Sequence, residues 1–428
     1  MFTSKRRRNM VRRSLIVCLA IAMVLFSSFS VVWATETSTN PLKLVKGYEQ
    51  GKLYTLGQAN VVVLSGTFRD MGRQYGALLG DQISQLYEEG INKPFIQTGM
   101  FSTMEVNAFV KQMYQGLPKR QKELLLGMAE GSGLPQEKVL CASEPVGIIL
   151  LVRKKFNGSN TGACSSVAVW GKRTVDGQTF TARNYDFPSL FRGLAQRFLT
   201  IVVYKPTDGS NAVAGVGLAG MISFIDAMND KGLYFQNNNA ADSAGLVLYP
   251  TRTEATTQLS NILFDADSKE EYNLLLNSQR ISYPTIVMLA DGKSASYYEL
   301  APWDLKERKD GGEQAIAAAN QFLLPEWGML NLPSPSDWYS TLRQSNMLTL
   351  ATSSRAKVDE KYMMSILDVQ LFNKDWSLGK GAAVIDKNPH EDEVTVWQVV
   401  TAPAKKRLYF RAPTVTDWQM VDLTELTR

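Results

Sequence analysis

The chain has 428 residues, a net charge of +5 and three cysteines, but its only histidine is His390. With a single histidine, a Ser/His/Asp or Cys/His catalytic site is not favoured. Three cysteines are too few for a disulfide scaffold. No Cys/His spacing resembles a zinc site, and His390-Glu391-Asp392-Glu393 reads as a solvated turn, so we expect no metal and no cofactor.

The first 34 residues are predicted to be an export signal. Six basic residues precede an uncharged stretch from Leu15 to Trp33, and Val32-Trp33-Ala34 suits signal peptidase, with Thr35 as the mature N-terminus. Because the apolar stretch is long, an uncleaved membrane anchor is the alternative. Removing six positive charges from +5 leaves −1, so the basic balance reflects export and nucleic-acid binding is not expected. The expected location is extracytoplasmic: secreted, periplasmic or cell-surface.

Residues 35–163 are predicted to be mainly helical. Apolar residues at helical spacing predict a helix over 70–89, and further helices are expected over 104–116 and 118–130. A polar Gly/Asn/Ser loop at 157–162 then leads to Cys164. Such a loop is a place where a cut in the chain is tolerated.

After Cys164 the pattern changes to strands joined by Asp-Gly and Asn-Asp-Lys-Gly turns. Strands are predicted over 164–170, 178–184, 197–204, 211–216, 221–227 and 233–238, around Asp291-Gly292, and over 393–401 and 406–411. Helices are predicted over 254–263, 268–278, 335–351 and 358–369. Strand groups that alternate with helix pairs indicate an α+β fold of stacked, largely antiparallel sheets covered by helices, an αββα arrangement. The expected division is 1–34, 35–163 and 164–428.

Cys164 begins a predicted hairpin that brings it near Arg183 and Asp186. If Cys164 is a nucleophile, its base is not an imidazole, and its own α-amino group is the candidate once the chain is cut between Ala163 and Cys164. The alternatives are a buried structural cysteine, a Cys141–Cys164 disulfide, and an ordinary ion pair between Arg183 and Asp186. Gly215-Val216-Gly217-Leu218-Ala219-Gly220 matches a dinucleotide fingerprint, but a predicted strand follows it, so we interpret it as a strand-turn-strand.

These motifs together resemble those of the N-terminal-nucleophile (Ntn) hydrolases of the penicillin acyltransferase and choloylglycine hydrolase group. The match covers roughly Ser65 to Arg411. It rests on the glycine-punctuated segment 66–76, on 131–144, on Cys164-Ser165-Ser166, on Arg183-Asn184-Tyr185-Asp186, and on the turn Met228-Asn229-Asp230-Lys231-Gly232-Leu233. Ala319-Asn320 and Arg343 match more weakly, since Gln321 stands where the family has His or Ser.

The resemblance implies a four-layer Ntn-hydrolase sandwich and assigns roles to these residues. Cys164 is the nucleophile, Arg183 lowers its pKa, and Asp186 holds the α-ammonium. Asn239 and Asn320 donate to the oxyanion, Arg343 lies near the site, and Tyr185 lines the acyl pocket. The α-amine and the thiol have reference pKa values of about 7.7–8.0 and about 8.5, so a proton passes between them easily. The helical residues 35–163 would be a pro-region, retained as a small subunit of a self-derived heterodimer.

The expected function is therefore that of an exported, self-processing hydrolase or acyltransferase acting on a small molecule with a linear, non-peptide amide bond. Hydrolysis is favoured because water is always available outside the cytoplasm. One alternative is a peptide or amino-acid amidase of the same fold. Another is a catalytically silent extracytoplasmic binding protein. A membrane is a partner only if the N-terminal segment stays uncleaved.

Overall fold

The structure is a computed structural model that describes residues 41–144, 163–240, 243, 249, 252–328, 340–371, 373, 377, 379, 393–413 and 415–427. All of them belong to one compact unit, Thr35–Arg428. The predicted export signal, the polar loop 157–162, residues 335–339 of a predicted helix and His390 lie outside the described residues. No helix among the described residues is long and apolar enough to span a membrane.

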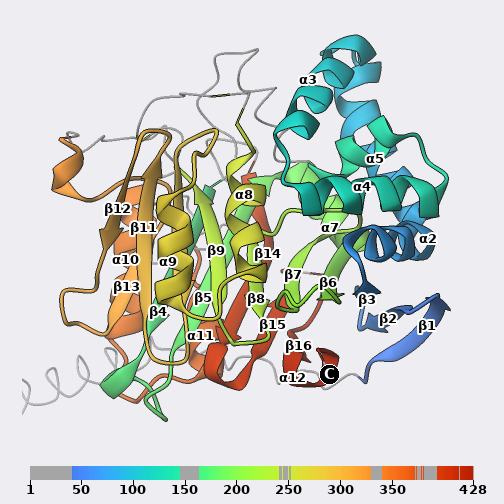
Figure 1. Ribbon diagram of the computed structural model, residues 1–428. Coiled ribbons are helices and arrows are strands. Elements are labelled where there is room, and N and C mark those ends of the chain that lie inside the picture. Colours follow the sequence, from blue (N-terminus) through green and yellow to red (C-terminus); the bar gives the residue numbers. More distant parts are fainter. Residues whose placement is uncertain are drawn as a thin grey trace, which may run out of the picture. The chain divides into compact units, whose positions relative to one another are not determined.

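Two β-sheets form the centre of the described chain (Figure 1). The larger, sheet A, consists in spatial order of β1 (Lys43–Tyr48), β2 (Gly51–Leu56), β3 (Ala59–Gly66), β6 (Leu199–Pro206), β7 (Val213–Leu218), β8 (Asp226–Asn229), β9 (Tyr234–Asn239), β10 (Thr285–Ala290), β11 (Ala295–Ala301) and β12 (Asp304–Arg308). Sheet B consists of β13 (Ala315–Ala318), β4 (Ala163–Val169), β5 (Phe180–Pro188), β14 (Glu393–Ala402), β15 (Arg407–Arg411) and β16 (Gln419–Asp422). Every described strand pair is antiparallel except β3 with β6.

The helices cover both outer faces of the stacked sheets. On sheet B, α10 (Ser340–Thr352) packs on β4 and β13, and α11 (Glu360–Leu367) packs on β5 and β14. On sheet A, α8 (Ala255–Asn261) and α9 (Lys269–Asn277) lie over β9, where the ring of Tyr272 in α9 lies 6.3 Å from that of Phe235 in β9, centroid to centroid. The short helix α12 (Leu423–Leu426) follows β16, and one-turn 3₁₀ segments occupy 171–173, 262–264, 325–327 and 403–405. The predicted α+β, αββα fold class is confirmed.

The inner faces of the sheets meet around polar side chains. In β9, Gln236 and Asn238 point to sheet B and donate to Ser166 Oγ at 2.9 and 3.4 Å. Asn237, between them, donates instead to Thr256 Oγ1 of α8 at 2.7 Å. This alternation is the two-residue period of a strand buried on both faces.

The helices before Cys164 lie close to their predicted positions. They are α2 (Phe68–Tyr87), α3 (Thr103–Gly116) and α4 (Lys119–Ser132), and α5 (Gln136–Ser143) follows them. In α2, Thr67 and Asp70 form a capping box, which satisfies two backbone N–H groups that lack helical partners. A π-helical segment, Glu88–Gln97, continues α2, and α7 (Ser189–Phe198) lies after β5.

This part of the chain also contains three strands that the sequence analysis did not predict. β3 carries a continuous apolar run, and most of its residues are buried. A strand buried on both faces has no alternating pattern, so the run gave no period-two signal. Through β3, residues before Cys164 form part of the same sheet as residues after it.

Candidate active site

Cys164 is the second residue of β4, which lies between β13 and β5 in sheet B. The antiparallel register places Cys164 opposite Tyr185 and Ser166 opposite Arg183. The thiol is 3% exposed, and its Sγ accepts a hydrogen bond from Arg183 Nη2 at 3.1 Å. The hairpin predicted from the Asp-Gly turn thus brings the cysteine and the arginine into contact.

Arg183 links the two sheets from a fully buried position. Its guanidinium forms an ion pair with Asp226 of β8 at 2.9 Å and donates to the carbonyls of Ile225 and Asn237 at 2.9 and 2.6 Å. Asp226 in turn accepts from Tyr234 Oη at 2.8 Å and from Trp397 Nε1 at 3.2 Å. A buried arginine needs a counter-charge and acceptors for its N–H groups. Asp226 and the two carbonyls supply these for Nη1 and Nη2, whereas the buried Nε has no hydrogen-bond partner among the described residues.

Asp226 was not among the predicted site residues, and the Arg183–Asp186 ion pair considered as an alternative is wrong. Arg183 pairs with Asp226 because two residues three apart on β5 point to opposite faces of the strand. The available signal was an acid inside the predicted strand 221–227, in which Ser223 is the only other polar residue.

Two of the remaining predicted residues, Asn320 and Arg343, contact the backbone of Cys164, and a third, Asn239, contacts Asn320. Its N–H donates to Asn320 Oδ1 at 2.8 Å, and its carbonyl accepts from Arg343 Nη1 at 2.8 Å. Arg343 Nη2 also donates to Asn320 Oδ1 at 2.8 Å, and Asn320 Nδ2 donates to the carbonyl of Asn239 at 2.8 Å. Since an arginine and a peptide N–H can only donate, the oxygen of Asn320 must face them. In the uncut chain Asn320 therefore acts as an acceptor for the backbone of the cysteine.

Asp186 lies near Arg343, and one of its two carboxylate oxygens accepts no hydrogen bond among the described residues. Its Oδ1 accepts from Thr395 Oγ1 at 2.6 Å, and its Oδ2 is 3.7 Å from Arg343 Nη1. That buried Oδ2 has no hydrogen-bond partner among the described residues. Burial raises the pKa of Asp186 to about 6, against the opposing effect of Arg343. A buried, unsatisfied carboxylate oxygen calls for an explanation, since such atoms are rare in folded proteins.

Two opposing effects set the pKa of the Cys164 thiol. Burial raises its pKa, and the nearby Arg183 offsets only part of that increase. Arg183 thus lowers the thiol pKa in the predicted direction, but burial has the larger effect, and the sequence pattern did not reveal how deeply the sulfur is buried.

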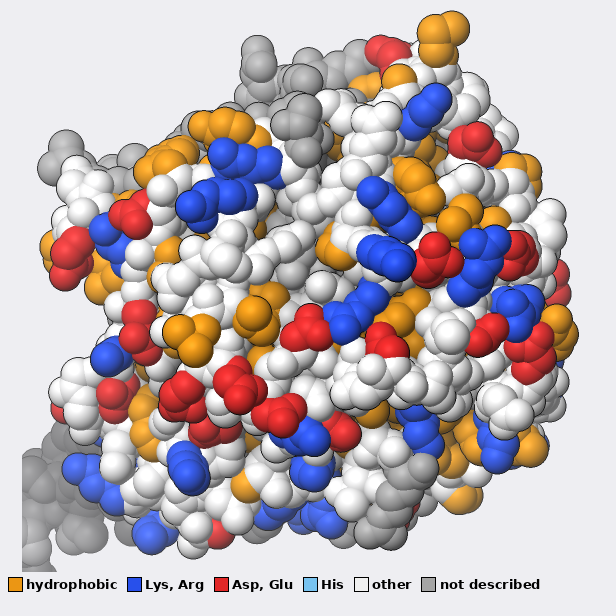
Figure 2. Space-filling model, viewed as in Figure 1, with side chains coloured by type: hydrophobic (Ala, Val, Ile, Leu, Met, Phe, Trp, Pro, Cys, Tyr) orange, Lys and Arg blue, Asp and Glu red, His pale blue; other side chains and the backbone are white. Residues whose placement is uncertain are grey.

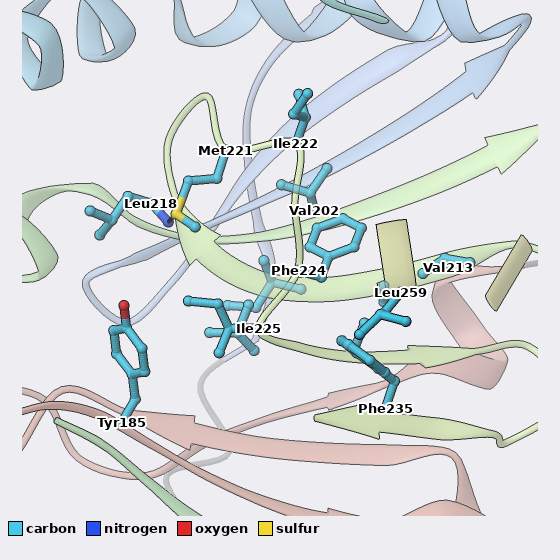
Figure 3. Packing of buried hydrophobic residues seen from close by; sticks show 14 of the residues in the cluster. Tyr185, Val202, Val213, Leu218, Met221, Ile222, Phe224, Ile225, Phe235 and Leu259 are labelled. Carbon is cyan, nitrogen blue, oxygen red and sulfur yellow. Dashed lines mark hydrogen bonds between the residues drawn. The ribbon is translucent and has the colours of Figure 1, made fainter. Parts of the chain in front are cut away.

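Tyr185 stands in an aromatic cluster beside the site. Its ring stacks on Trp397 and Phe187 at centroid distances of 4.0 and 5.3 Å. Figure 3 shows Tyr185 below the loop that carries Met221 and Ile222, with Ile225 close to its ring. The Tyr185 ring thus packs on aromatic side chains, and the guanidinium carbon of Arg183 lies 5.3 Å from its centroid.

The second described cysteine, Cys141, is separate from this site. Cys141 lies in α5, both Cys141 and Cys164 are free, and the Cys141–Cys164 disulfide considered as an alternative is therefore wrong. Burial raises the pKa of Cys141 to about 12. Within the described ranges, no three His, Cys, Asp or Glu side chains are grouped to hold a metal ion.

A surface hollow of about 480 Å³ opens elsewhere, at the starts of α2 and α4. Its lining includes Phe68, Lys119 and Arg120 but none of the predicted site residues. Ion pairs such as Arg120–Asp265 lie at its edge, and basic and acidic side chains are interspersed over the face in Figure 2.

Comparison with known proteins gives distant relatives. No protein-family model matches the chain. Protein dcd1B of Dictyostelium discoideum is 26% identical over 260 residues, which are 54% of this chain and 48% of that protein. The chain thus spans about half the length of the curated relative it matches.

Three solved structures are similar at low identity. A mutant conjugated bile acid hydrolase from Clostridium perfringens has a TM-score of 0.40 and 14% identity, covering 62% of this chain and 94% of that one. The Caenorhabditis elegans ortholog of N-acylethanolamine-hydrolyzing acid amidase has a TM-score of 0.38 and 14% identity, covering 56% and 93%. Penicillin V acylase from Agrobacterium tumefaciens has a TM-score of 0.37 and 16% identity, covering 62% and 87%.

Proposed function

We propose that this protein is an exported, self-processing Ntn hydrolase that cleaves a linear, non-peptide amide bond through a thioester on Cys164. The observation that carries the proposal is the arrangement at the start of β4. The thiol accepts from Arg183, the backbone N–H donates to Asn320, and Asp186 Oδ2 has no hydrogen-bond partner among the described residues. An α-ammonium at Cys164, formed by a cut before it, would bring a positive charge toward this unsatisfied oxygen.

The first step frees that amine. Cys164 Sγ attacks the carbonyl carbon of Ala163, the C–N bond breaks, and the thiol proton passes to the nitrogen of Cys164. Water then hydrolyses the resulting thioester, which leaves a carboxylate on Ala163 and a free thiol and amine on Cys164. Arg343 and Asn320 hold the cysteine backbone on both sides during this step.

In the second step the same thiol attacks the amide substrate. The α-amine takes the thiol proton, and the new ammonium and Arg183 together lower the thiol pKa that burial raises in the uncut chain. Asn239 is proposed to donate to the developing oxyanion. The ammonium then protonates the departing amine, and water, deprotonated by the α-amine, releases the acyl group. Transfer of the acyl group to another amine would use the same intermediate.

The proposed substrate class is supported by the aromatic packing of Tyr185 and by the names of the similar structures. An acyl chain would lie against the aromatic cluster of Tyr185, Phe187 and Trp397. The compounds to screen are bile-salt conjugates, N-acylethanolamines, penicillins and N-acyl amino acids. Hydrolysis of peptides or amino-acid amides alone would favour the alternative of a peptide or amino-acid amidase.

Intact-mass analysis of the purified protein tests the proposal. We expect two chains that meet between Ala163 and Cys164, whereas Cys164→Ala should stay as one inactive chain. An active protein whose chain is uncut at Cys164 would overturn the self-processing step. A single chain with no activity on any amide would instead favour the extracytoplasmic binding protein.

Asn239→Ala tests the oxyanion assignment separately. The variant should lose about a hundredfold in kcat while iodoacetamide still alkylates Cys164 at a near-normal rate, because alkylation develops no carbonyl oxyanion. Cys141 should react more slowly, since burial raises its pKa to about 12. Normal turnover by Asn239→Ala would remove Asn239 from the mechanism.

A further inference from the structure

Two buried glutamates face each other outside the proposed chemistry. Glu144 directly follows α5 and is 0% exposed, and Glu254 directly precedes α8 and is 5% exposed. Glu144 comes before Cys164 in the chain and Glu254 after it. Their hydrogen bonds therefore join the two parts of the chain on either side of the cysteine.

Glu254 has the contacts of a carboxylate. Its two oxygens accept from the backbone N–H groups of Thr256 and Thr257 at 3.0 and 2.8 Å. Tyr283 Oη donates a third hydrogen bond at 2.6 Å. Hydrogen bonds donated to a buried carboxylate favour its charged form.

Glu144 has far fewer donors. Its Oε2 is 3.4 Å from Ser223 Oγ, and its Oε1 is 2.8 Å from Thr257 Oγ1. The same Thr257 Oγ1 lies 3.1 Å from Glu254 Oε2. A hydroxyl has one hydrogen, so it can donate to one of these two oxygens and must accept from the other. If both contacts are hydrogen bonds, one of the two carboxyl groups supplies the second proton.

We infer that Glu144 is a neutral carboxylic acid at neutral pH and that it donates to Thr257 Oγ1, which donates to Glu254. The described titratable groups that face Glu144 are Glu254 and Tyr283, neither of them basic. Burial and the charge of Glu254 both raise the pKa of Glu144 well above its usual value. This series of hydrogen bonds connects the C-terminal end of α5 to the N-terminal end of α8.

The start of α8 is also connected to the site. Thr256 Oγ1 accepts from Asn237 Nδ2 at 2.7 Å, and the carbonyl of Asn237 accepts from Arg183 Nη2 at 2.6 Å. Loss of the proton from Glu144 places a second negative charge beside Glu254 and weakens the structure that holds Arg183. The hydrogen bonds of Glu144 are thus a pH-sensitive contact between the part of the chain before Cys164 and the part after it.

The direction of the pH effect follows from proton linkage. The folded chain keeps the proton of Glu144 at pH values where the unfolded chain has lost it. The contribution of Glu144 to stability is therefore complete below about pH 4.5 and falls as the pH rises toward the folded pKa. Within that range, one proton changes the unfolding equilibrium constant by up to about tenfold per pH unit.

Glu144→Gln tests this inference, because its amide can still donate to Thr257 Oγ1 but cannot ionise. Urea unfolding would be measured from pH 6.5 to 8.5, above the pKa of about 6 of Asp186. All samples would carry Cys164→Ala, so that each is one chain whether or not the proposed self-cleavage is right. We expect the unfolding constant of the parent protein to rise by several-fold to tenfold per pH unit relative to Glu144→Gln.

The matched control is Glu299→Gln. Glu299 is equally buried, but it pairs with Arg308 at 3.1 Å and accepts from Trp327 Nε1 at 2.8 Å, so it shares no hydroxyl with a second acid. Its replacement should change stability without changing the pH slope. Parallel curves for Glu144→Gln and its parent would overturn the inference.

A second measurement covers the case in which Glu144→Gln does not fold. The infrared spectrum of the Cys164→Ala protein at pH 7.5 should contain the carbonyl band of a protonated carboxylic acid. Thr257→Val, which removes the bridging hydroxyl but keeps the side-chain volume, should shift that band. Absence of the band, or a band that Thr257→Val leaves unchanged, would contradict the assignment.

Discussion

The α2–α4 helix pair and the Cys164 site are both buried, but opposite kinds of contact hold them together. The helices meet through glycines: a Cβ added at Gly76 would lie 2.2 Å from the carbonyl oxygen of Met128, and one at Gly127 would lie 2.1 Å from that of Arg69. The site instead contains buried charges, with Arg183 paired to Asp226 and Arg343 near Asp186. Close backbone packing tolerates no added atom, whereas the charged site tolerates no unpaired charge.

The largest effect is expected in the site. Asp226→Asn keeps the shape of the side chain but leaves the charge of Arg183 without its partner. We expect a loss of about 3–5 kcal/mol in the free energy of unfolding. Urea unfolding of the Cys164→Ala chain would measure it, and a loss below about 1 kcal/mol would show that Arg183 is neutralised in another way.

The matching change in the helix pair is Gly76→Ala. The added methyl group would collide with the backbone of α4, so α2 and α4 must move apart. We expect a loss of about 1–3 kcal/mol, as for other overpacked interiors.

Gly193 in α7 provides the control. No atom lies within 4 Å of an added Cβ there, so Gly193→Ala should be neutral or slightly stabilising. Equal losses in the two variants would mean that the α2–α4 contact is not the cause.

Asp186 should make the uncut chain less stable as the pH rises. Burial raises its folded pKa to about 6, above the ordinary value of 3.8, so its contribution to stability falls as the pH increases between these values. In the Cys164→Ala chain we expect a loss of up to about 1.4 kcal/mol per pH unit in that range, and Asp186→Asn should reduce it. An unchanged slope in Asp186→Asn would mean that Asp186 is already ionised in the uncut chain.

The smallest expected effect is at the only histidine. His390→Ala should leave the pH dependence of the rate unchanged, because the proposed base is the α-amine of Cys164. A loss of more than about tenfold, roughly 1.4 kcal/mol, would show that the base has been misplaced.

Local patterns in the sequence predicted much of this molecule. The Asp-Gly turn predicted the β4–β5 hairpin and hence the contact between Cys164 and Arg183. Motif resemblance selected Asn320 and Arg343, which both contact the cysteine backbone. Their catalytic roles stay predictions.

The parts that could not be predicted depend on distant residues. Asp226 and Glu144 are ordinary acids in the sequence, and only the packing of distant elements gives them their partners. Likewise, the pKa of Cys164 depends on burial that no local pattern encodes.

The parallel pairing of β3 with β6 has a consequence for the order in which the chain can fold. Asn60 pairs with Thr200, and Gly66 pairs with Pro206. The parallel pairing of β3 can therefore form only when a segment about 140 residues further along the chain is present. Until residues 199–206 have been synthesised, one edge of β3 has no strand beside it. Truncated chains that end before residue 206 would expose this Val-rich edge, and such edges promote aggregation.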